Sequence, residues 1–335
     1  MKTLHRRPRT ASLISALIAG GVVVAIAASD RPSDLWHTFA RIQPTWLLAA
    51  LAAELAAYVG YVLAYRAMIS APGSRRLSLM LTVRLVVAGF GPFVPLGGFA
   101  FDRQALRAVH RSRRRARIQV LRLGVMEYLL LALAAFVCAV ILFLGNRRAS
   151  PVLTLPWIIG VPPGLLLGWT ATQPRVLRYF QQSHGAVRRW IGDLLAGVEV
   201  LRSVVKRPLE HPRALLGIAV YWAAEIACLG FALRCFGDEI ALPALILAYA
   251  TGYAASRRSL PLGGAGITEA LLTVALIAVH VDSADALLSV LCYRAVNFLA
   301  PIIPGLLAHS SLEAMLEGDA PAEIVAESPT GSRAE

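Results

Sequence analysis

Long apolar stretches recur along this chain, and their lengths are typical of membrane-spanning helices. A transmembrane helix needs about 20 mostly apolar residues to cross the hydrocarbon core of a bilayer. Stretches of this kind predict membrane helices near residues 11–29, 46–69, 122–144, 152–171, 214–236 and 285–309. The pattern therefore predicts an all-α polytopic membrane protein with about six full transmembrane helices.

Two further apolar segments, 79–101 and 242–281, are interrupted by proline and glycine. The first contains Pro95-Leu96-Gly97-Gly98 and is followed by Asp102, and the second contains Pro261-Leu262-Gly263-Gly264-Ala265-Gly266 and then Glu269. Irregular backbone at membrane depth is tolerated only where it is buried in protein or lines a wet cavity. Two interrupted segments at matching places in two halves of a chain indicate a transporter-like site at their interface.

The basic residues predict how these segments are oriented. Residues 103–122 carry eight arginines, and residues 175–213 carry eight Lys or Arg against three acids, so both stretches are expected in the cytoplasm. A full crossing by 79–101 would leave the first cluster outside, which favours a re-entrant hairpin that enters and leaves on the cytoplasmic side. The same argument predicts that 242–281 is a hairpin entering from the opposite face. Half one, about 46–144, and half two, about 214–309, then form an inverted repeat.

Composition supports a membrane protein rather than a soluble enzyme. The chain is 57% hydrophobic and only 16% charged. Its net charge of +13 is concentrated between the apolar spans, where orientation and anionic head groups explain it, so we expect no nucleic-acid partner. The four cysteines lie in or beside apolar spans without C-x-x-C or Cys/His spacing. We therefore expect neither a disulfide framework nor a metal site, and no cofactor.

The chain is expected to form one membrane domain over residues 1–312. Within it, 175–213 has apolar residues spaced between arginines and predicts an amphipathic helix at the cytoplasmic interface, which links the two halves. Residues 313–335 are polar and acidic, and are expected to be a disordered cytoplasmic tail. With a basic N-terminus, both termini are predicted to be cytoplasmic, in a bacterial-type inner membrane.

Polar residues inside the predicted spans are candidates for function because each is costly at membrane depth. Glu54 shares a helix face with Tyr58, Tyr61 and Tyr65, a stripe that is predicted to face the protein interior as a helix contact or as a lining of a substrate path. Glu225 is well inside its span and so near mid-membrane. A carboxylate at that depth is hard to explain without a function.

The second interrupted segment carries the strongest candidates. Arg257 and Arg258 precede the break and could meet a phosphate, or could serve orientation by reaching the interface. Glu269 begins the returning helix, where it either caps that helix or serves a site. A salt bridge between Glu269 and Arg294 is the simplest joint explanation for both residues, whether as a structural pair, a gate or part of a phosphate receptor.

These motifs carry a family resemblance. The run Pro261–Glu269, followed by Tyr293-Arg294 and by Asn297-Phe298-Leu299-Ala300-Pro301, resembles the C-terminal signature of the lysylphosphatidylglycerol synthase transmembrane, or flippase-like, family. The first break, with Asp102 and Arg103, is similar to the family's first Pro/Gly-acid-Arg element. The resemblance covers roughly residues 10–312.

The resemblance implies a polytopic protein that moves a lipid with a charged head group between leaflets. Because the chain ends soon after Ser311, the aminoacyl transferase activity of fused members is not expected here, and the protein is not expected to be an enzyme. Its partners would be membrane lipids with phosphate-bearing head groups. The substrate-binding residues that the resemblance and the charge pattern single out are Arg257, Arg258, Pro261, Gly263, Gly264, Gly266, Glu269, Arg294, Asp102, Arg103 and Glu225.

Two other functions remain open from the sequence. A membrane-embedded transferase on lipid-linked substrates would use Glu225 or Glu269 as a general base, although the outer loops are poor in the acids and histidines that such enzymes usually cluster. A subunit of a cell-envelope complex, paired with an envelope enzyme or with its own copies, would use 175–213 as a docking surface. No nucleotide-binding G-x-x-x-x-G-K-[ST] loop supplies an energy source.

Overall fold

The described part of the chain is built from helices around four long apolar ones. The computed structural model describes residues 36–37, 39–69, 78–90, 102–103, 106, 113–145, 150–182, 185–207, 210–253 and 266–299. The four long helices, each long and apolar enough to cross a membrane, are α3 (Pro44–Ile69), α6 (Arg113–Leu144), α7 (Pro151–Ala171) and α11 (Pro212–Cys235). The all-α membrane architecture predicted from the apolar pattern is confirmed. The span expected at 11–29 lies outside the described residues.

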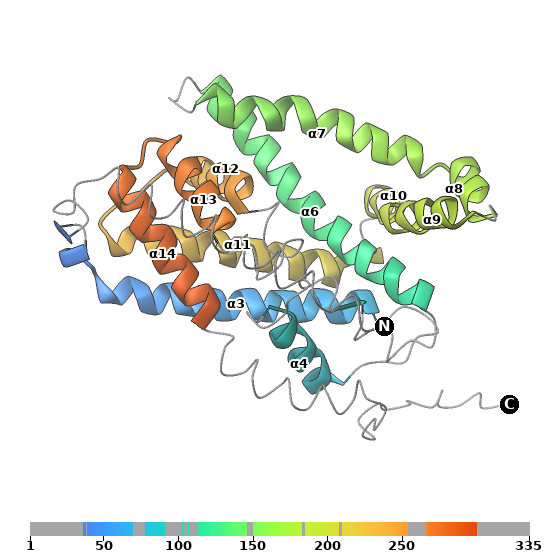
Figure 1. The fold of residues 1–335 in the computed structure, drawn as a ribbon, viewed down its shortest axis with the longest axis horizontal. Helices are drawn as coiled ribbons and strands as arrows, with labels where there is room; N and C mark the ends of the chain where they lie inside the picture. The colour runs from blue at the N-terminus through green and yellow to red at the C-terminus, as the bar shows by residue number, and fades with distance from the viewer. Residues whose placement is uncertain are drawn as a thin grey trace, which may run out of the picture.

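Helices α3 and α11 lie side by side through the middle of the molecule, and α6 crosses obliquely between α3 and α7 (Figure 1). The α3–α11 contact is close because Gly60 and Gly217 meet at it. A Cβ atom on Gly60 would lie 2.6 Å from the backbone nitrogen of Tyr221 and 2.7 Å from the carbonyl oxygen of Gly217. Small residues let helix backbones approach in this way inside membranes, where dispersion rather than the hydrophobic effect holds helices together. The two halves of the chain are therefore joined backbone to backbone.

Replacing Gly60 with Ala is expected to destabilise the protein by about 1–3 kcal/mol, since the new methyl group meets backbone atoms that cannot rotate away. Thermal unfolding of the detergent-purified protein measures the effect. Gly164→Ala in α7 is the matched control, because nothing lies within 4 Å of a Cβ atom there. Equal melting temperatures for the Gly60 variant and the control would contradict the close contact.

Shorter apolar helices occupy the two interrupted segments. Helix α4 (Leu79–Phe90) begins the first, and α12 (Leu242–Tyr253) and α13 (Ile267–Ile277) flank the second. Both α12 and α13 are too short to cross a bilayer alone, and they pack against each other at Gly252, where a Cβ atom would lie 2.6 Å from the Cα atom of Leu272. Helix α14 (Ser283–Leu299) follows and packs on α11 and α13.

The single amphipathic helix expected over 175–213 is instead divided into three. These are α8 (Pro174–Gln181), α9 (Ala186–Val198) and α10 (Val200–Lys206). Extended backbone at Gly185 precedes α9, which explains why the apolar periodicity does not continue through one helix. Asp193 holds α9 against α6, accepting hydrogen bonds from Arg114 (2.7 Å) and Arg117 (2.9 Å). This part of the chain thus packs on the bundle through charges as well as through its apolar face.

Opposite ends of the bundle carry opposite kinds of charge. Helices α8–α10 lie at one end, and the α13–α14 turn lies toward the other (Figure 1). At the second end, partial burial raises the pKa of the Asp238 carboxyl, the neighbouring Asp285 and Asp282 raise it further, and Arg41 partly offsets this. Arg41 also approaches Asp285 at 3.8 Å. The arginines of α6, α9 and α10 stand at the end where the sequence predicts the cytoplasm.

Candidate functional site

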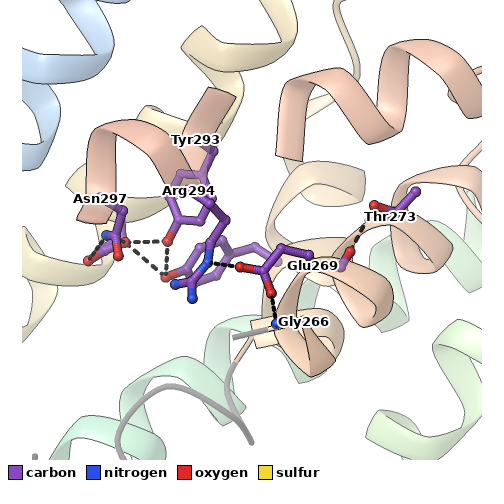
Figure 2. A network of polar contacts seen from close by, with 8 residues as sticks. Gly266, Glu269, Thr273, Tyr293, Arg294 and Asn297 are labelled. Carbon is purple, nitrogen blue, oxygen red and sulfur yellow. Dashed lines mark hydrogen bonds and ion pairs between the residues drawn. The ribbon is translucent and has the colours of Figure 1, made fainter. Parts of the chain in front are cut away.

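The candidate site is a chain of buried polar side chains at the junction of α3, α11, α12, α13 and α14. Its members on α13 and α14 are drawn in Figure 2, where Arg294 reaches from α14 to Glu269 at the start of α13, and Tyr293 and Asn297 lie on the same stretch of α14. Residues 293, 294 and 297 fall together because a helix repeats every 3.6 residues. One short stretch of α14 therefore contacts two neighbouring sets of acids, which are Glu269 and the pair Glu54 and Glu225.

The first group is an ion pair. Arg294 donates from Nε to Oε1 of Glu269 at 2.6 Å, and the two side chains are only 5% and 10% exposed. This is the salt bridge that the sequence predicts. The other oxygen of Glu269 accepts a hydrogen bond from the backbone N–H of Gly266, so the carboxylate also caps α13 (Figure 2). Glu269 therefore both caps α13 and pairs with Arg294.

Gly266 allows this capping because its backbone has φ of +79°. In that left-handed region a residue with a Cβ atom is strained, whereas glycine is not. The turn aims the Gly266 N–H at the carboxylate three residues later. The last glycine of the interrupted segment thus has a specific geometric role at the entry to α13.

The second group contains two carboxylates from the two halves of the chain. The amide of Asn297 lies between them, with Nδ2 at 2.9 and 3.0 Å from the Glu54 oxygens and 3.4 Å from both Glu225 oxygens. Tyr293 donates its hydroxyl to Glu225 at 2.6 Å and Tyr249 does so at 3.2 Å. Both glutamates are fully buried. Hydrogen bonds to an ionised carboxylate are among the strong ones, and here they join α3, α11, α12 and α14.

A further buried acid fixes α6 to this junction. The Oε2 atom of Glu127 lies 3.4 Å from the Tyr61 hydroxyl, and its backbone oxygen accepts a hydrogen bond from the Trp222 indole at 2.8 Å. Tyr61 belongs to the tyrosine stripe on α3, and both it and Tyr65 are buried. The stripe therefore faces the protein interior, as predicted.

The structure describes only some of the predicted site residues. Gly266, Glu269, Arg294 and Glu225 come together, and the shared helix α14 links them. Asp102 is buried and Arg103 is exposed, in the short described piece of the first interrupted segment. Predicted site residues that lie outside the described residues are Arg257, Arg258, Pro261, Gly263 and Gly264.

Sequence reasoning did not include Asn297, Tyr249 or Glu54 among the substrate-binding candidates. Glu54 and Asn297 were visible as polar residues within apolar spans, which is the signal that could have placed them in the site. Tyr249 gives little signal, because a tyrosine body is apolar and is common in buried membrane helices. Its role depends on a contact with Glu225 across two helices.

The arrangement suits charge recognition better than metal chemistry. Among the residues that the structure describes, no three His, Cys, Asp or Glu side chains are placed to hold a metal ion. The site offers the guanidinium of Arg294, whose partner Glu269 lies in the first turn of the short helix α13. Beside this pair lie the hydrogen-bonded acids Glu54 and Glu225. Such groups can exchange partners with a charged ligand or with each other.

A comparison with family models agrees with the motifs and the fold. The model described as the lysylphosphatidylglycerol synthase TM region matches residues 12–305, which includes all the described helices and both interrupted segments. No curated protein shows significant similarity to the chain. Because the family match covers most of the chain and agrees with the helical membrane architecture, the chain belongs to the lysylphosphatidylglycerol synthase transmembrane-region family.

Proposed function

We propose that this protein moves a lipid with a charged head group across the cytoplasmic membrane. The family match supports a role in lipid metabolism or transport at a membrane. The observation that carries the finer proposal is the buried Glu269–Arg294 ion pair at the point where the second interrupted segment re-enters a helix. A buried charge pair is costly to maintain for stability alone, and replacing it by apolar groups is often neutral or stabilising. A transport role explains why charge is kept there.

In this proposal the phosphate of the head group exchanges with Glu269 for Arg294. Arg257 and Arg258, which precede the break in sequence, would attract the phosphate, and the glycines of the break would let the backbone approach it. The two interrupted segments would be re-entrant hairpins from opposite faces, with α8–α10 on the cytoplasmic side. The arginines at that end of the bundle support this orientation.

The Asn297-bridged glutamates would hold the two halves in register during the exchange. Glu54 lies in the first half and Glu225 in the second, and one amide on α14 contacts both. In this proposal the protein is a carrier rather than an enzyme.

Lipid translocation in liposomes tests the proposal. The purified protein is reconstituted with head-group-labelled anionic, zwitterionic or aminoacylated lipids, and a membrane-impermeant quencher reports the label in the outer leaflet. We expect protein-dependent movement of at least one charged lipid, and a loss of about tenfold or more in Glu269→Gln/Arg294→Ala, as expected for removal of a charge-assisted contact.

A matched control separates this effect from general loss of charge. Arg234 and Glu239 form an ion pair at the exposed end of α11, with side chains 37% and 70% exposed, so Arg234→Gln/Glu239→Gln should leave transport unchanged. If folded wild-type protein moves none of the lipids, or if both double variants transport as well as wild type, the proposal fails.

A further inference from the structure

A second polar cavity lies at the basic end of the bundle, away from the Glu269–Arg294 site. It has a volume of about 650 Å³ and is enclosed by the last turn of α3, the start of α6, the end of α7, helix α10 and the turn into α11. Its walls include Met68, Gln119, Thr172, Ser203 and His211. The cavity lies where α3 and α7 end and α11 begins, and these are three of the helices long and apolar enough to cross a membrane.

Four cations line this cavity and only two acids oppose them. The cations are Arg122, Arg202, Lys206 and Arg207, and the acids are Glu199 and Glu210. Arg207 pairs with Glu210 at 2.8 Å, whereas Arg122 approaches Glu199 only at 3.8 Å. The balance leaves an excess of positive charge in a concave, partly enclosed space, where ion pairing is stronger than on open surface.

Within the part of the chain that the structure describes, the remaining two cations, Arg202 and Lys206, form no ion pair with a carboxylate. Arg202 donates to the backbone oxygen of Thr172 at 3.1 Å and lies over the Trp169 ring, 4.9 Å from its centroid. Lys206 lies 6.0 Å from the same ring, and within the described ranges it forms no ion pair. A cation that rests on an aromatic ring is kept in place without losing its capacity to bind an anion.

From these groups we infer that the cavity binds a phosphate group. The phosphate contacts Lys206, Arg202 and Arg122. This chemistry is shared by the head groups of membrane phospholipids and by soluble phosphate esters. The inference does not rest on the proposed transport function, because it uses different residues at a different end of the bundle.

Ligand-induced thermal stabilisation of the full-length protein in an uncharged detergent tests the site. The probes are short-chain phosphatidylglycerol, glycerol phosphate, inorganic phosphate and sulfate, because a ligand that binds only the folded state raises the melting temperature. We expect saturable stabilisation by the phosphate ligands. In Arg122→Gln/Lys206→Gln the apparent Kd should rise by about tenfold or more, since hydrogen bonds to two charged groups are lost.

One further variant makes the result specific. Arg213→Gln is the matched control, because Arg213 is an exposed cation near the cavity that does not line it, and its Kd should equal that of wild type.

The probes also distinguish the source of the phosphate. Stabilisation by the short-chain lipid at concentrations where glycerol phosphate has no effect identifies a lipid head group, and equal stabilisation identifies a soluble ester. Absence of saturable stabilisation by every probe overturns the inference. It is equally overturned if Arg213→Gln weakens binding as much as the double variant does.

Discussion

Replacing Arg294 with Met is expected to lower the free energy of unfolding by about 3–5 kcal/mol, because it leaves the Glu269 carboxylate buried without its cation. Arg294 is 4% exposed and Glu269 is 8% exposed, so water cannot easily replace the lost partner. Unfolding of the purified protein in mixed micelles, followed by helix content, measures the change. The loss should exceed that of any other single substitution on α14 that removes one contact.

The double variant Glu269→Gln/Arg294→Met is the decisive comparison. The amide oxygen of Gln can still accept the hydrogen bond from Gly266, so α13 keeps its cap while both charges disappear. Stability should return to within about 1 kcal/mol of wild type, since neutral replacement of a buried pair is often tolerated. A double variant as unstable as Arg294→Met would show that the arginine stabilises the fold through other contacts. The recovered double variant should still be defective in lipid movement.

Replacing Asn297 with Leu is the second large expected effect. The substitution removes the amide that contacts both Glu54 and Glu225, at the junction of the two halves. A hydrogen bond to a charged group contributes about 1.5–3 kcal/mol, and its loss leaves buried carboxylates less well satisfied. We therefore expect a drop of at least about 2 kcal/mol in the free energy of unfolding, measured in the same micelle assay.

Glu54→Gln is expected to restore part of this loss when combined with Asn297→Leu. It replaces one of the two neighbouring buried carboxyl groups by an amide, which can donate toward Glu225. Ala295→Leu is the control for added apolar volume on α14, because Ala295 is exposed on the helix and should tolerate the change. Wild-type stability in Asn297→Leu would mean that the bridge does not couple the two halves.

The long helices were predictable because the thickness of a bilayer sets the length of apolar sequence that each spanning helix needs. Expected spans at 46–69, 152–171 and 214–236 match α3, α7 and α11 to within one or two residues. Helix α6 begins at Arg113 rather than near 122, because arginine favours helix and a hydropathy rule ends a span where charge begins. Local composition thus predicts where a chain can cross a membrane, but it does not predict how far a helix continues into water.

The contacts within the candidate site were predictable only for charged residues, because these need a partner of opposite charge inside the membrane. Glu269 and Arg294 had to meet something inside the membrane, and each was the nearest plausible partner for the other. The pairing of Asn297 with Glu54, 243 residues apart, depends on how the halves dock, and that information is spread over many packing contacts. The division of 175–213 into three helices was missed because apolar residues recur throughout the stretch, and their spacing does not show the extended backbone at Gly185 that separates α8 from α9.

The Glu269–Arg294 contact also bears on how tightly any anion can be held at that arginine. A phosphate arriving there does not find an empty receptor, since it must displace a carboxylate already bound at 2.6 Å. Its affinity is then the difference between two ion pairs of similar strength, a small quantity even when each pair is strong. Because the two ion pairs would be of similar strength, the Glu269 carboxylate could displace a bound phosphate again. An intramolecular competitor of this kind shortens the residence time of a bound anion, and it raises the anion concentration that half-saturates the site.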